Sequence, residues 1–485
     1  MRKVLIMMIF FNCCFGIQQS SISEETRPNI IVIFTDDQGY ADLGIQNQLE
    51  DVKTPNIDLM AAKGVTFKYG YSTAPQCIPS RAGLLTGRYQ QKFGLDENGL
   101  IPLPLEEIII PQRLKQAGYI TGMTGKWHLE PNRLSHIWIR DHMPLLAEKK
   151  LNKGIKIDPS DIPFSKKIPY MPCDRGFDEC FQGEMIYYLA NYDLDGNEIQ
   201  SQFIVDKRFR IDVQTEATLA FIDRNHDKPF FFYTSYFGPH VPLESTEYYL
   251  RRFEGDMPER RRYALAMISA IDDGIGEIRK KLKQHNILEN TIIFFVSDNG
   301  APTKMLKKDL PISYKLGAWD GSLNDPLVGE KGMLSEGGIR VPFILSWPKK
   351  IKKGIKYESP VSILDIAATA VSAAGLTVPK ILDGVNLIPF LIGNKKGLSY
   401  RFLYWRFWDQ SAIIRGNYKF LKAGKKEYLF DISIPLPERE NLISKNQNEA
   451  KRLRKTLFKW SKELKTKGIP NKLNRSSEWY DFYFE

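Results

Sequence analysis

Five continuous apolar runs recur along the chain and constrain its fold more than any other feature. They are residues 29–34, 119–124, 229–234, 291–296 and 341–347. Apolar runs without polar alternation are typical of parallel strands that are buried on both faces. Two of the segments between these runs, 110–117 and 262–284, have apolar residues at every third or fourth position, which is the spacing of a helix. This alternation predicts an α/β domain with a large, mixed but mainly parallel sheet flanked by helices.

The chain changes character after about residue 384. The segments 402–407, 411–422 and 428–432 are short, rich in aromatic residues and bounded by turns, which predicts an antiparallel sheet. Segment 448–464 then reads as a basic amphipathic helix. A chain of 485 residues can hold one large domain and a smaller one. We therefore expect a main α/β domain over residues 23–384 and a smaller α+β subdomain over 385–485.

The amino terminus indicates export. A basic start at residues 1–3 precedes an apolar run over 4–11, which is too short to span a bilayer. We predict a signal peptide over residues 1–22, with a buried strand as the alternative. No later stretch is long and apolar enough to cross a membrane. Cys13 and Cys14 leave a lipid anchor open, so we expect a periplasmic or secreted protein, either soluble or a lipoprotein.

Removal of this signal leaves three cysteines, Cys77, Cys173 and Cys180. An odd count in an exported protein leaves one thiol unpaired. Cys173 and Cys180 are close enough in sequence to form a disulfide, and two buried free thiols are the alternative. The formal net charge of +11 suits an anionic ligand or polymer. Lysine runs such as 349–356 are, however, also typical of a solvated face.

Polar clusters follow four of the apolar runs. They occupy residues 35–39, 125–128, 238–242 and 297–300. Because the carboxyl ends of parallel strands form the ligand crevice of an α/β sheet, we expect these clusters to converge. Two of them supply the oxygen donors Asp36, Asp37, Asp298 and Asn299 without Cys or His, a set that favours Ca²⁺ or Mg²⁺ over zinc. Either cluster alone would also suit a turn or a cap.

Two histidines and one cysteine add candidate reactive groups. His128 follows Lys126 by two residues and His240 lies in the third cluster, which suits an acid/base pair around an anion held by lysine. Hydrogen-bonded structural histidines are the alternative. A short helix predicted to begin near Pro79 would place Cys77 by its positive end, with Arg81 one turn on. Cys77 is therefore a candidate nucleophile or, equally, a buried thiol.

These motifs together resemble the formylglycine-dependent sulfatases of the alkaline phosphatase superfamily. Cys-x-Pro-Ser-Arg at 77–81 is similar to the motif that their maturation enzymes recognise, and Leu-Thr-Gly-Arg follows at 85–88. The likeness continues, in the order of the family, through six further places. They are 35–37, 125–128, the His240 loop, 297–300, Gly332 with 336–342, and 383–387. The resemblance covers nearly the whole mature chain and implies an alkaline phosphatase-like fold.

The resemblance also implies a set of site residues. A formylglycine-generating enzyme would oxidise Cys77 to formylglycine (3-oxoalanine), whose hydrate attacks sulfur. One Ca²⁺ per chain would be held by Asp36, Asp37, Asp298, Asn299 and residue 77. Arg81 and Lys126 would stabilise the nucleophile, and Lys331 would hold a sulfate oxygen. His128 would take the proton that lets the covalent sulfate leave, and His240 would protonate the leaving oxygen.

The function implied is hydrolysis of a sulfate ester on a carbohydrate, with an algal polysaccharide such as carrageenan ranked first. The alternatives are a phosphonate monoester or phosphodiester hydrolase of the same superfamily, and a catalytically retired glycan-binding protein. We expect no nucleic-acid partner. Segments 129–182 and 301–330 are the predicted specificity loops. Their aromatic residues, which suit either stacking on sugar rings or packing, are Trp138, Tyr170, Tyr314 and Trp319.

Overall fold

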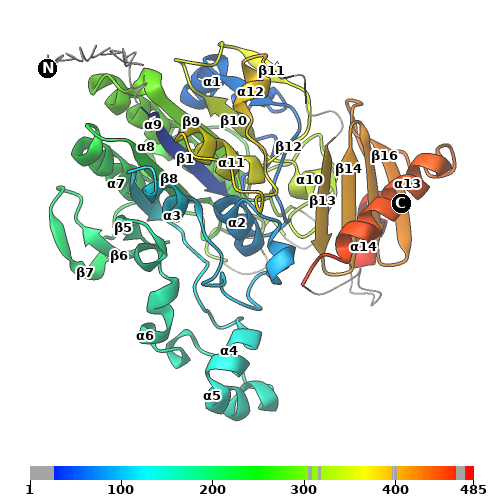
Figure 1. The fold of residues 1–485 in the computed structure, drawn as a ribbon, viewed down its shortest axis with the longest axis horizontal. Helices are drawn as coiled ribbons and strands as arrows, with labels where there is room; N and C mark the ends of the chain where they lie inside the picture. Colours follow the sequence, from blue (N-terminus) through cyan, green and yellow to red (C-terminus); the bar gives the residue numbers. More distant parts are fainter. Residues whose placement is uncertain are drawn as a thin grey trace, which may run out of the picture.

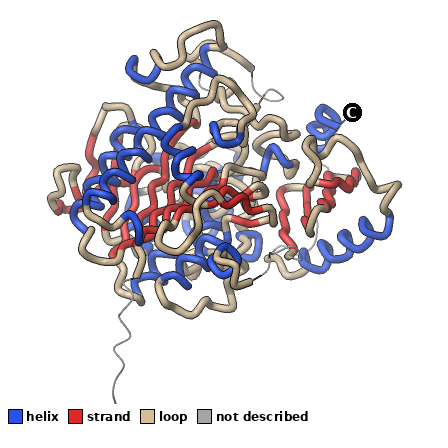
Figure 2. Tube along the Cα trace, turned by 90° about the horizontal axis from the view of Figure 1, so that it is seen from above, coloured by secondary structure: helices blue, strands red, loops and turns tan. Residues whose placement is uncertain are grey.

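The computed structural model describes residues 27–303, 308–314, 318–395, 397, 401–465 and 476–484. Within them, a ten-stranded sheet lies between layers of helices, and a separate four-stranded antiparallel sheet lies beside it (Figures 1 and 2). This arrangement confirms the predicted fold class. Among the described helices, none is both long and apolar enough to cross a bilayer. The predicted signal over residues 1–22, with Cys13 and Cys14, lies outside the described residues.

The four strands that carry the polar clusters lie side by side in the middle of the large sheet. Their order is β9 (Thr291–Ser297), β1 (Asn29–Asp36), β8 (Phe230–Pro239) and β4 (Ile120–Gly125). All three pairings between them are parallel. The carboxyl ends of the four strands therefore share one edge of the sheet, as the sequence predicted.

Short strands extend the sheet on both sides. Beyond β4 lie β5 (Glu179–Gln182), β6 (Tyr187–Tyr192) and β7 (Glu198–Val205); beyond β9 lie β10 (Phe343–Ser346), β2 (Val65–Phe67) and β11 (Ile355–Tyr357). The prediction that run 341–347 is a parallel strand is wrong, because β10 is antiparallel to both β9 and β2. After β9 the chain re-enters the sheet from the same end without a long crossover helix, which reverses the strand direction.

Helices bury both faces of the central strands. Along β1, Ile30, Val32 and Phe34 belong to one apolar cluster, whereas Ile31 and Ile33 belong to the other. The first face packs on α2 (Cys77–Thr86), α3 (Ile110–Lys115) and α11 (Leu364–Ala373). The second packs on α1 (Pro55–Ala62), α7 (Arg210–Asn225) and α9 (Glu259–Gln284). Burial on both faces explains why the strands show no polar alternation.

Residues 136–175 project from the main body around a small apolar cluster of their own. This projection contains α4 (His136–His142), α5 (Pro144–Lys149) and α6 (Phe164–Lys167), in the lower part of Figure 1. Trp138 donates from Nε1 to the Tyr170 hydroxyl at 2.9 Å, and both side chains are buried. These two aromatic residues of the predicted specificity loop therefore pack in the protein rather than face solvent.

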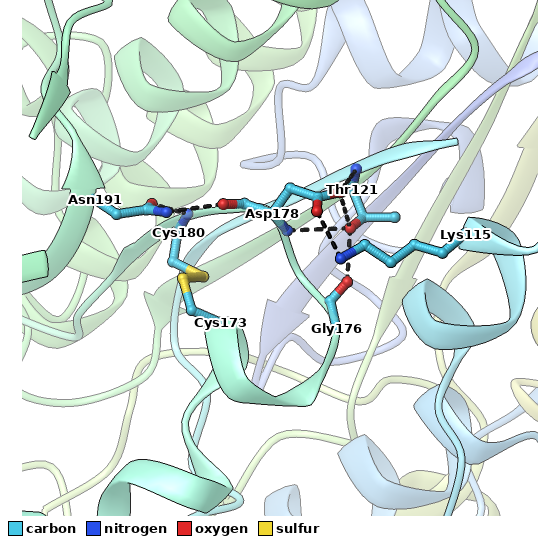
Figure 3. Close-up of a disulfide and its surroundings, with 7 residues drawn as sticks. All are labelled: Lys115, Thr121, Cys173, Gly176, Asp178, Cys180 and Asn191. Carbon is cyan, nitrogen blue, oxygen red and sulfur yellow. Dashed lines mark hydrogen bonds and ion pairs between the residues drawn. A yellow bond between two sulfur atoms is a disulfide. The ribbon is translucent and has the colours of Figure 1, made fainter. Parts of the chain in front are cut away.

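A disulfide joins the base of the projection to the sheet. Cys173 and Cys180 are bonded, which decides between the two alternatives left open by the sequence (Figure 3). Cys180 lies on β5, which pairs with β4. Next to it, Asp178 accepts a hydrogen bond from the Thr121 amide at 2.9 Å and forms an ion pair with Lys115 at 2.6 Å. The disulfide and these polar contacts fasten the return of the chain into the sheet.

The C-terminal sheet is a four-stranded meander. Its strands are β13 (Phe402–Phe407), β14 (Gln410–Arg415), β15 (Tyr418–Ala423) and β16 (Lys426–Asp431). The single strand predicted over 411–422 is wrong, because Gly416 turns the chain at a φ of 57° and separates β14 from β15. One face packs on α13 (Gln447–Ser461), close to the predicted 448–464 helix, and the other on α14 (Ser476–Phe484).

Five short elements complete the fold. They are β3 (Gly70–Tyr71), α8 (Glu247–Leu250), α10 (Glu336–Ile339), β12 (Val361–Ser362) and α12 (Ile388–Leu391). The predicted boundary between residues 384 and 385 falls just before α12, between the two sheets, and stays a prediction.

A buried ion cluster joins the C-terminal sheet to the main domain. Lys419 of β15 is fully buried between Glu336 of α10 at 2.9 Å and Glu438 at 2.8 Å. Tyr71 donates from its hydroxyl to Glu336 Oε2 at 2.9 Å. Burial and the neighbouring Glu336 raise the pKa of Glu438 to about 7, although Lys419 acts in the opposite direction. Lys419 thus compensates Glu438 and shares the compensation of Glu336 with Arg340, whose Nη1 lies 3.5 Å from Glu336 Oε2.

We expect Lys419→Met to lower the free energy of unfolding by about 3–5 kcal/mol, because it leaves the buried Glu438 without its cation and Glu336 with Arg340 alone. The loss should be larger at pH 8 than at pH 5. Burial raises the pKa of Glu438 to about 7 in the folded protein, so stability falls as the pH rises through this pKa and the carboxyl becomes charged. The fall should be larger in the variant, because Lys419 no longer faces that charge. Denaturant unfolding at both pH values measures this. The exposed Lys425→Met is the control, and equal losses in the two variants would contradict the interpretation.

Candidate active site

The predicted site residues meet at the carboxyl edge of the four central strands. Asp36 ends β1 and Asp37 follows it at a φ of 61°, while Asp298 follows β9. Lys126 comes directly after β4 and His240 directly after β8. The remaining members come from other segments and are Cys77, Arg81, His128, Asn299 and Lys331. The structure therefore gathers, around one point, groups that lie up to about 300 residues apart in sequence.

Cys77 is the first residue of α2, so the helix begins two residues earlier than predicted. Its side chain is buried, with Sγ at 3.5 Å from Asp36 Oδ1 and 3.3 Å from Lys331 Nζ. Burial raises the pKa of the Cys77 thiol well above its usual value, although Lys126 and Lys331 oppose this. The unmodified thiol therefore stays protonated at neutral pH and is not the thiolate that the helix position alone would favour.

Two side chains fix the backbone around Cys77. Gln76 accepts a hydrogen bond from the Asn98 amide through Oε1 at 2.9 Å, and Asn98 accepts one from the Ile78 amide through Oδ1 at 3.0 Å. This reciprocal pair clamps the first turn of α2 to the loop that carries Asn98. Sequence reasoning missed the clamp, because neither residue belongs to a recognisable motif.

Arg81 is a fully buried brace for the acidic groups. Its Nη2 lies 3.1 Å from Asp298 Oδ2 and 3.3 Å from Asp36 Oδ2. Its Nη1 donates to Ser235 Oγ at 2.6 Å and to the Lys126 carbonyl at 3.2 Å. Ser235 was also missed by sequence reasoning, and its only signal is a small polar residue near the end of an apolar strand. The guanidinium contacts the ends of all four central strands and holds them together.

Lys126 and Lys331 neutralise the first two carboxylates. Lys126 Nζ lies 2.5 Å from Asp36 Oδ2, and Lys331 Nζ lies 2.7 Å from Asp37. Lys126 is directed there by Gly125, which has a φ of 84°; a Cβ at this position would lie 1.9 Å from the Ser235 carbonyl oxygen. Only glycine fits this close approach of two strands.

The three carboxylates differ in their electrostatic environments. Burial raises the pKa of Asp36, but Lys126, His240 and Arg81 outweigh it and bring the value well below the usual range. The pKa of Asp37 is also lowered, because Lys331 and His240 outweigh the effect of burial. Burial and the charge of Asp36 raise the pKa of Asp298 to about 7. An additional cation among these groups would favour the charged form of all three carboxylates.

The donor atoms of this site suit a hard cation. Asp36, Asp37, Cys77 and His240 each offer one ligand atom within 4.8 Å of the others. Asn299 donates from Nδ2 to Asp37 Oδ1 at 2.6 Å, while its own buried Oδ1 has no hydrogen-bond partner among the described residues. An unpartnered amide oxygen beside two carboxylates is the arrangement that Ca²⁺ or Mg²⁺ satisfies.

Two histidines belong to the site. His240 Nδ1 lies 2.5 Å from the Val241 carbonyl oxygen, which orients Nε2 towards Asp37 Oδ2 at 3.5 Å. Burial lowers the pKa of His240 to about 4. His128 has a φ of 59°, and its buried Nδ1 has no hydrogen-bond partner in the described structure. Burial and the charge of Lys126 lower the pKa of His128 well below its usual value. His240 thus also belongs to the potential ligand cluster, which the sequence did not predict.

The aromatic residues of the second predicted specificity loop differ from each other. Trp319 is buried and donates from Nε1 to the Ser322 carbonyl at 3.0 Å, so it is a packing residue. Tyr314 is 55% exposed.

The C-terminal sheet adds contacts near the Cys77 clamp that the sequence did not predict. Arg406 of β13 pairs with Asp96 at 2.5 Å, and Trp408 donates from Nε1 to Glu97.

Comparisons with known proteins agree with this geometry. A family model described as Sulfatase matches residues 28–376, and one described as N-sulphoglucosamine sulphohydrolase, C-terminal, matches residues 329–464. The N-acetylgalactosamine-6-sulfatase of Canis lupus familiaris is 31% identical over 429 residues, covering 81% of this chain and 71% of the relative. Arylsulfatase A of Homo sapiens is 30% identical, covering 81% of this chain and 74% of the relative.

Among solved structures, Ps i-CgsB superposes with a TM-score of 0.73 at 28% sequence identity, covering 94% of this chain and 97% of the other. The fold and the matches define a hydrolase with an alkaline phosphatase-like architecture. The chain belongs to the sulfatase family. It is therefore a sulfuric ester hydrolase, as the sequence motifs implied.

We expect Arg81→Met, measured in the presence of a chelator, to lower the free energy of unfolding by about 3–5 kcal/mol, because Asp36 and Asp298 lose their shared buried cation. Lys331→Met is the matched control, since its side chain is 18% exposed and water can partly replace its charge. Denaturant unfolding of both variants tests this. A loss for Lys331→Met as large as that for Arg81→Met would show that the brace is not specific to Arg81.

Proposed function

We propose that this chain removes sulfate from a sulfated carbohydrate, with an algal polysaccharide such as carrageenan as the first candidate. The observation that carries the proposal is the position of Cys77, at the start of α2 between Asp36 and Lys331. The choice of glycan is supported by the similarity to Ps i-CgsB in a complex with k-i-k-neocarrahexaose, which has a TM-score of 0.71 and 27% identity. The net charge of +11 suits such a polyanion.

The nucleophile in this proposal is formylglycine, produced from Cys77 by a maturation enzyme. When hydrated, formylglycine supplies a hydroxyl group for attack on sulfur. The group at Cβ of residue 77 lies between a carboxylate and an ammonium, so its proton and its charge both have a partner. The clamp formed by Gln76 and Asn98 keeps this group in place without help from the substrate.

Asp36, Asp37, Asp298 and Asn299, together with residue 77, would hold one Ca²⁺. Oxygen donors dominate this set, and the unpartnered Oδ1 of Asn299 provides a vacant acceptor within it. When bound, the ion would polarise the sulfate and favour the ionised nucleophile. His240 also reaches this cluster, and the assignment of its Nε2 to the substrate side follows the family pattern.

The remaining side chains would divide charge stabilisation from proton transfer. Lys331, 3.3 Å from Cys77 Sγ, is placed to hold an oxygen of a sulfate at residue 77, while Lys126 and Arg81 stabilise the negative charge beside it. His128 has a buried nitrogen without a hydrogen-bond partner in the described structure, and it would take the proton that lets the covalent sulfate leave. His240, whose Nε2 lies 3.5 Å from Asp37 Oδ2, would protonate the leaving oxygen.

The place of action in this proposal is outside the cytoplasm. The basic and apolar start of the chain supports export as a periplasmic or secreted enzyme, and the Cys173–Cys180 disulfide suits an oxidising compartment. A sulfated polymer is too large to enter a cell intact, so a depolymerising or desulfating enzyme meets it outside.

The experiment that tests the nucleophile is peptide mass spectrometry after co-expression with a formylglycine-generating enzyme. We expect the Cys77 peptide to show the mass loss of thiol-to-aldehyde conversion. Cys77→Ser should lower turnover of a sulfate ester by about 10⁴-fold or more without changing the fold, because the nucleophile is absent. The double variant Cys173→Ser/Cys180→Ser is the thiol control and should still be converted at Cys77.

Sulfated oligosaccharides should be turned over and phosphonate monoesters or phosphodiesters should not. An unmodified Cys77, under conditions that convert a known sulfatase, would contradict the proposed mechanism. Preferential turnover of phosphonates would instead assign the site to the alternative hydrolase class.

Asp298→Ala should weaken binding of calcium by at least about 10-fold, since even an outer-shell partner typically contributes that much. Elemental analysis of the purified protein, followed by a calcium titration monitored through thermal stability, measures the change. The exposed Asp141→Ala is the control. An unchanged calcium stoichiometry in Asp298→Ala would remove this residue from the ligand set.

A further inference from the structure

A second strongly basic surface lies at the opposite end of the sheet from the active site. It is a groove of about 1110 Å³ between α1, the C-terminal half of α9 and the loop after β10, in the upper part of Figure 1. Six of its lining residues are basic: Lys63, Arg279, Lys280, Lys283, Lys352 and Lys353. Glu289 is the single acidic residue among the residues that line it in the described structure. We call this surface the basic groove.

The charges of the lysines in the basic groove are not compensated by ion pairs within the described part of the protein. Lys63, Lys280, Lys283, Lys352 and Lys353 are exposed, and within the described part of the chain none of them forms an ion pair. Many other surface lysines and arginines of the chain do form such pairs, for example Lys281 with Asp223 at 2.6 Å. Five uncompensated cations around one concavity repel each other, and an anionic ligand would relieve this repulsion.

The residues that line the basic groove favour a sulfated sugar chain over a nucleic acid or a lipid bilayer. Apolar surface from Leu59 and Leu288 lies among the cations, and Leu59 is 47% exposed. Sugar rings with anionic substituents present this same combination of apolar and charged surface. Among the described lining residues no side chain is aromatic, so unpaired nucleic-acid bases would find no stacking surface. A concave shape also takes a chain rather than a flat bilayer.

The extent of the surface suits a polymer rather than a single small anion. A neighbouring groove of about 830 Å³ shares Asn286 with the basic groove, and its lining includes the cations Arg27, Lys228 and Lys350, the acidic Asp227 and the buried Trp347. The two grooves together run around the amino-terminal end of the sheet. β9 separates them from Asp298, and its seven residues span about 20 Å at 3.3 Å per residue. The basic groove and the active site therefore cannot hold the same sugar residue.

We propose that the basic groove is a secondary binding site for the sulfated polysaccharide, and this proposal deepens and rests on the proposed function. A polymer held there keeps the enzyme attached while the active site acts on another segment or a neighbouring chain. Attachment raises the effective concentration of substrate near the active site without any contact to the reacting group. The lysine run over residues 349–356, which on sequence alone suits a solvated face, contributes two of the cations that bind it.

The test is affinity electrophoresis of Cys77→Ser protein in gels with and without iota-carrageenan, with neutral agarose as the reference polymer. The groove variant is Lys280→Gln/Lys283→Gln/Lys352→Gln/Lys353→Gln. The matched control removes four exposed lysines of and just after α13, as Lys451→Gln/Lys455→Gln/Lys459→Gln/Lys462→Gln. We expect the groove variant to bind carrageenan about five-fold more weakly and the control variant to change little, because charge that is screened beyond about 10 Å acts locally.

The same substitutions in the active enzyme give a second readout. Turnover of a small soluble sulfate ester should be unchanged, while turnover of dilute polymer should fall with the loss of binding. Equal weakening in the groove and control variants would overturn the proposal, since net charge alone would then explain the binding. A third gel containing DNA separates the two kinds of polyanion. If the groove variant loses retention on DNA but not on carrageenan, the proposal is overturned as well.

The two proposals fail in different ways. If converted protein hydrolyses no sulfate ester but the groove variant still loses carrageenan retention, the proposed function falls and the groove remains a polyanion site. If desulfation proceeds and retention is unaffected by the groove substitutions, the groove proposal alone is overturned.

Discussion

The structure depends on the mutual compensation of six charges at one edge of the large sheet, five of which are buried. Burying the charge of Asp36, Asp37 or Asp298 in this water-poor position without a partner would cost several kcal/mol of free energy for each ion. Arg81, Lys126 and Lys331 offset them at distances between 2.5 and 3.3 Å. None of these side chains is stable there alone, so the site forms only when β9, β1, β8 and β4 lie side by side in the observed parallel order.

A short segment connects this charge network to the C-terminal sheet. Lys331 reaches Asp37 and Cys77 from a loop whose next residue, Gly332, donates its amide hydrogen to the Pro75 carbonyl at 2.9 Å. Five residues after Lys331, Glu336 is fixed by Lys419 of β15. The short segment between Lys331 and Glu336 is therefore held by the active site at one end and by the second sheet at the other. The C-terminal sheet thus helps to position Lys331 through this segment, although it supplies none of the predicted ligands.

Sequence reasoning succeeded where the local pattern of residue types is enough to indicate burial or a strand end. Unbroken apolar runs identified the central strands, and the polar residues after them identified the site, because carboxyl ends of parallel strands must share an edge. It failed where the outcome depends on a distant partner. The direction of β10 depends on how the chain returns from β9, and the roles of Ser235, Asn98 and Gln76 depend on contacts across 20 to 154 residues. The aromatic residues Trp138, Tyr170 and Trp319 could be assigned to packing only once their burial was known.

The projection formed by residues 136–175 has a separate apolar cluster, and the disulfide fastens its base to the sheet. Its cluster is separate from the two that bury the central strands, and its polar ties to the main body include the hydrogen bond from Trp127 Nε1 to the Tyr170 carbonyl at 2.8 Å. The projection and the charge network at residue 36 can therefore be engineered separately, so a graft of another loop between residues 136 and 162 would change the outer surface of the protein without replacing any side chain of the network.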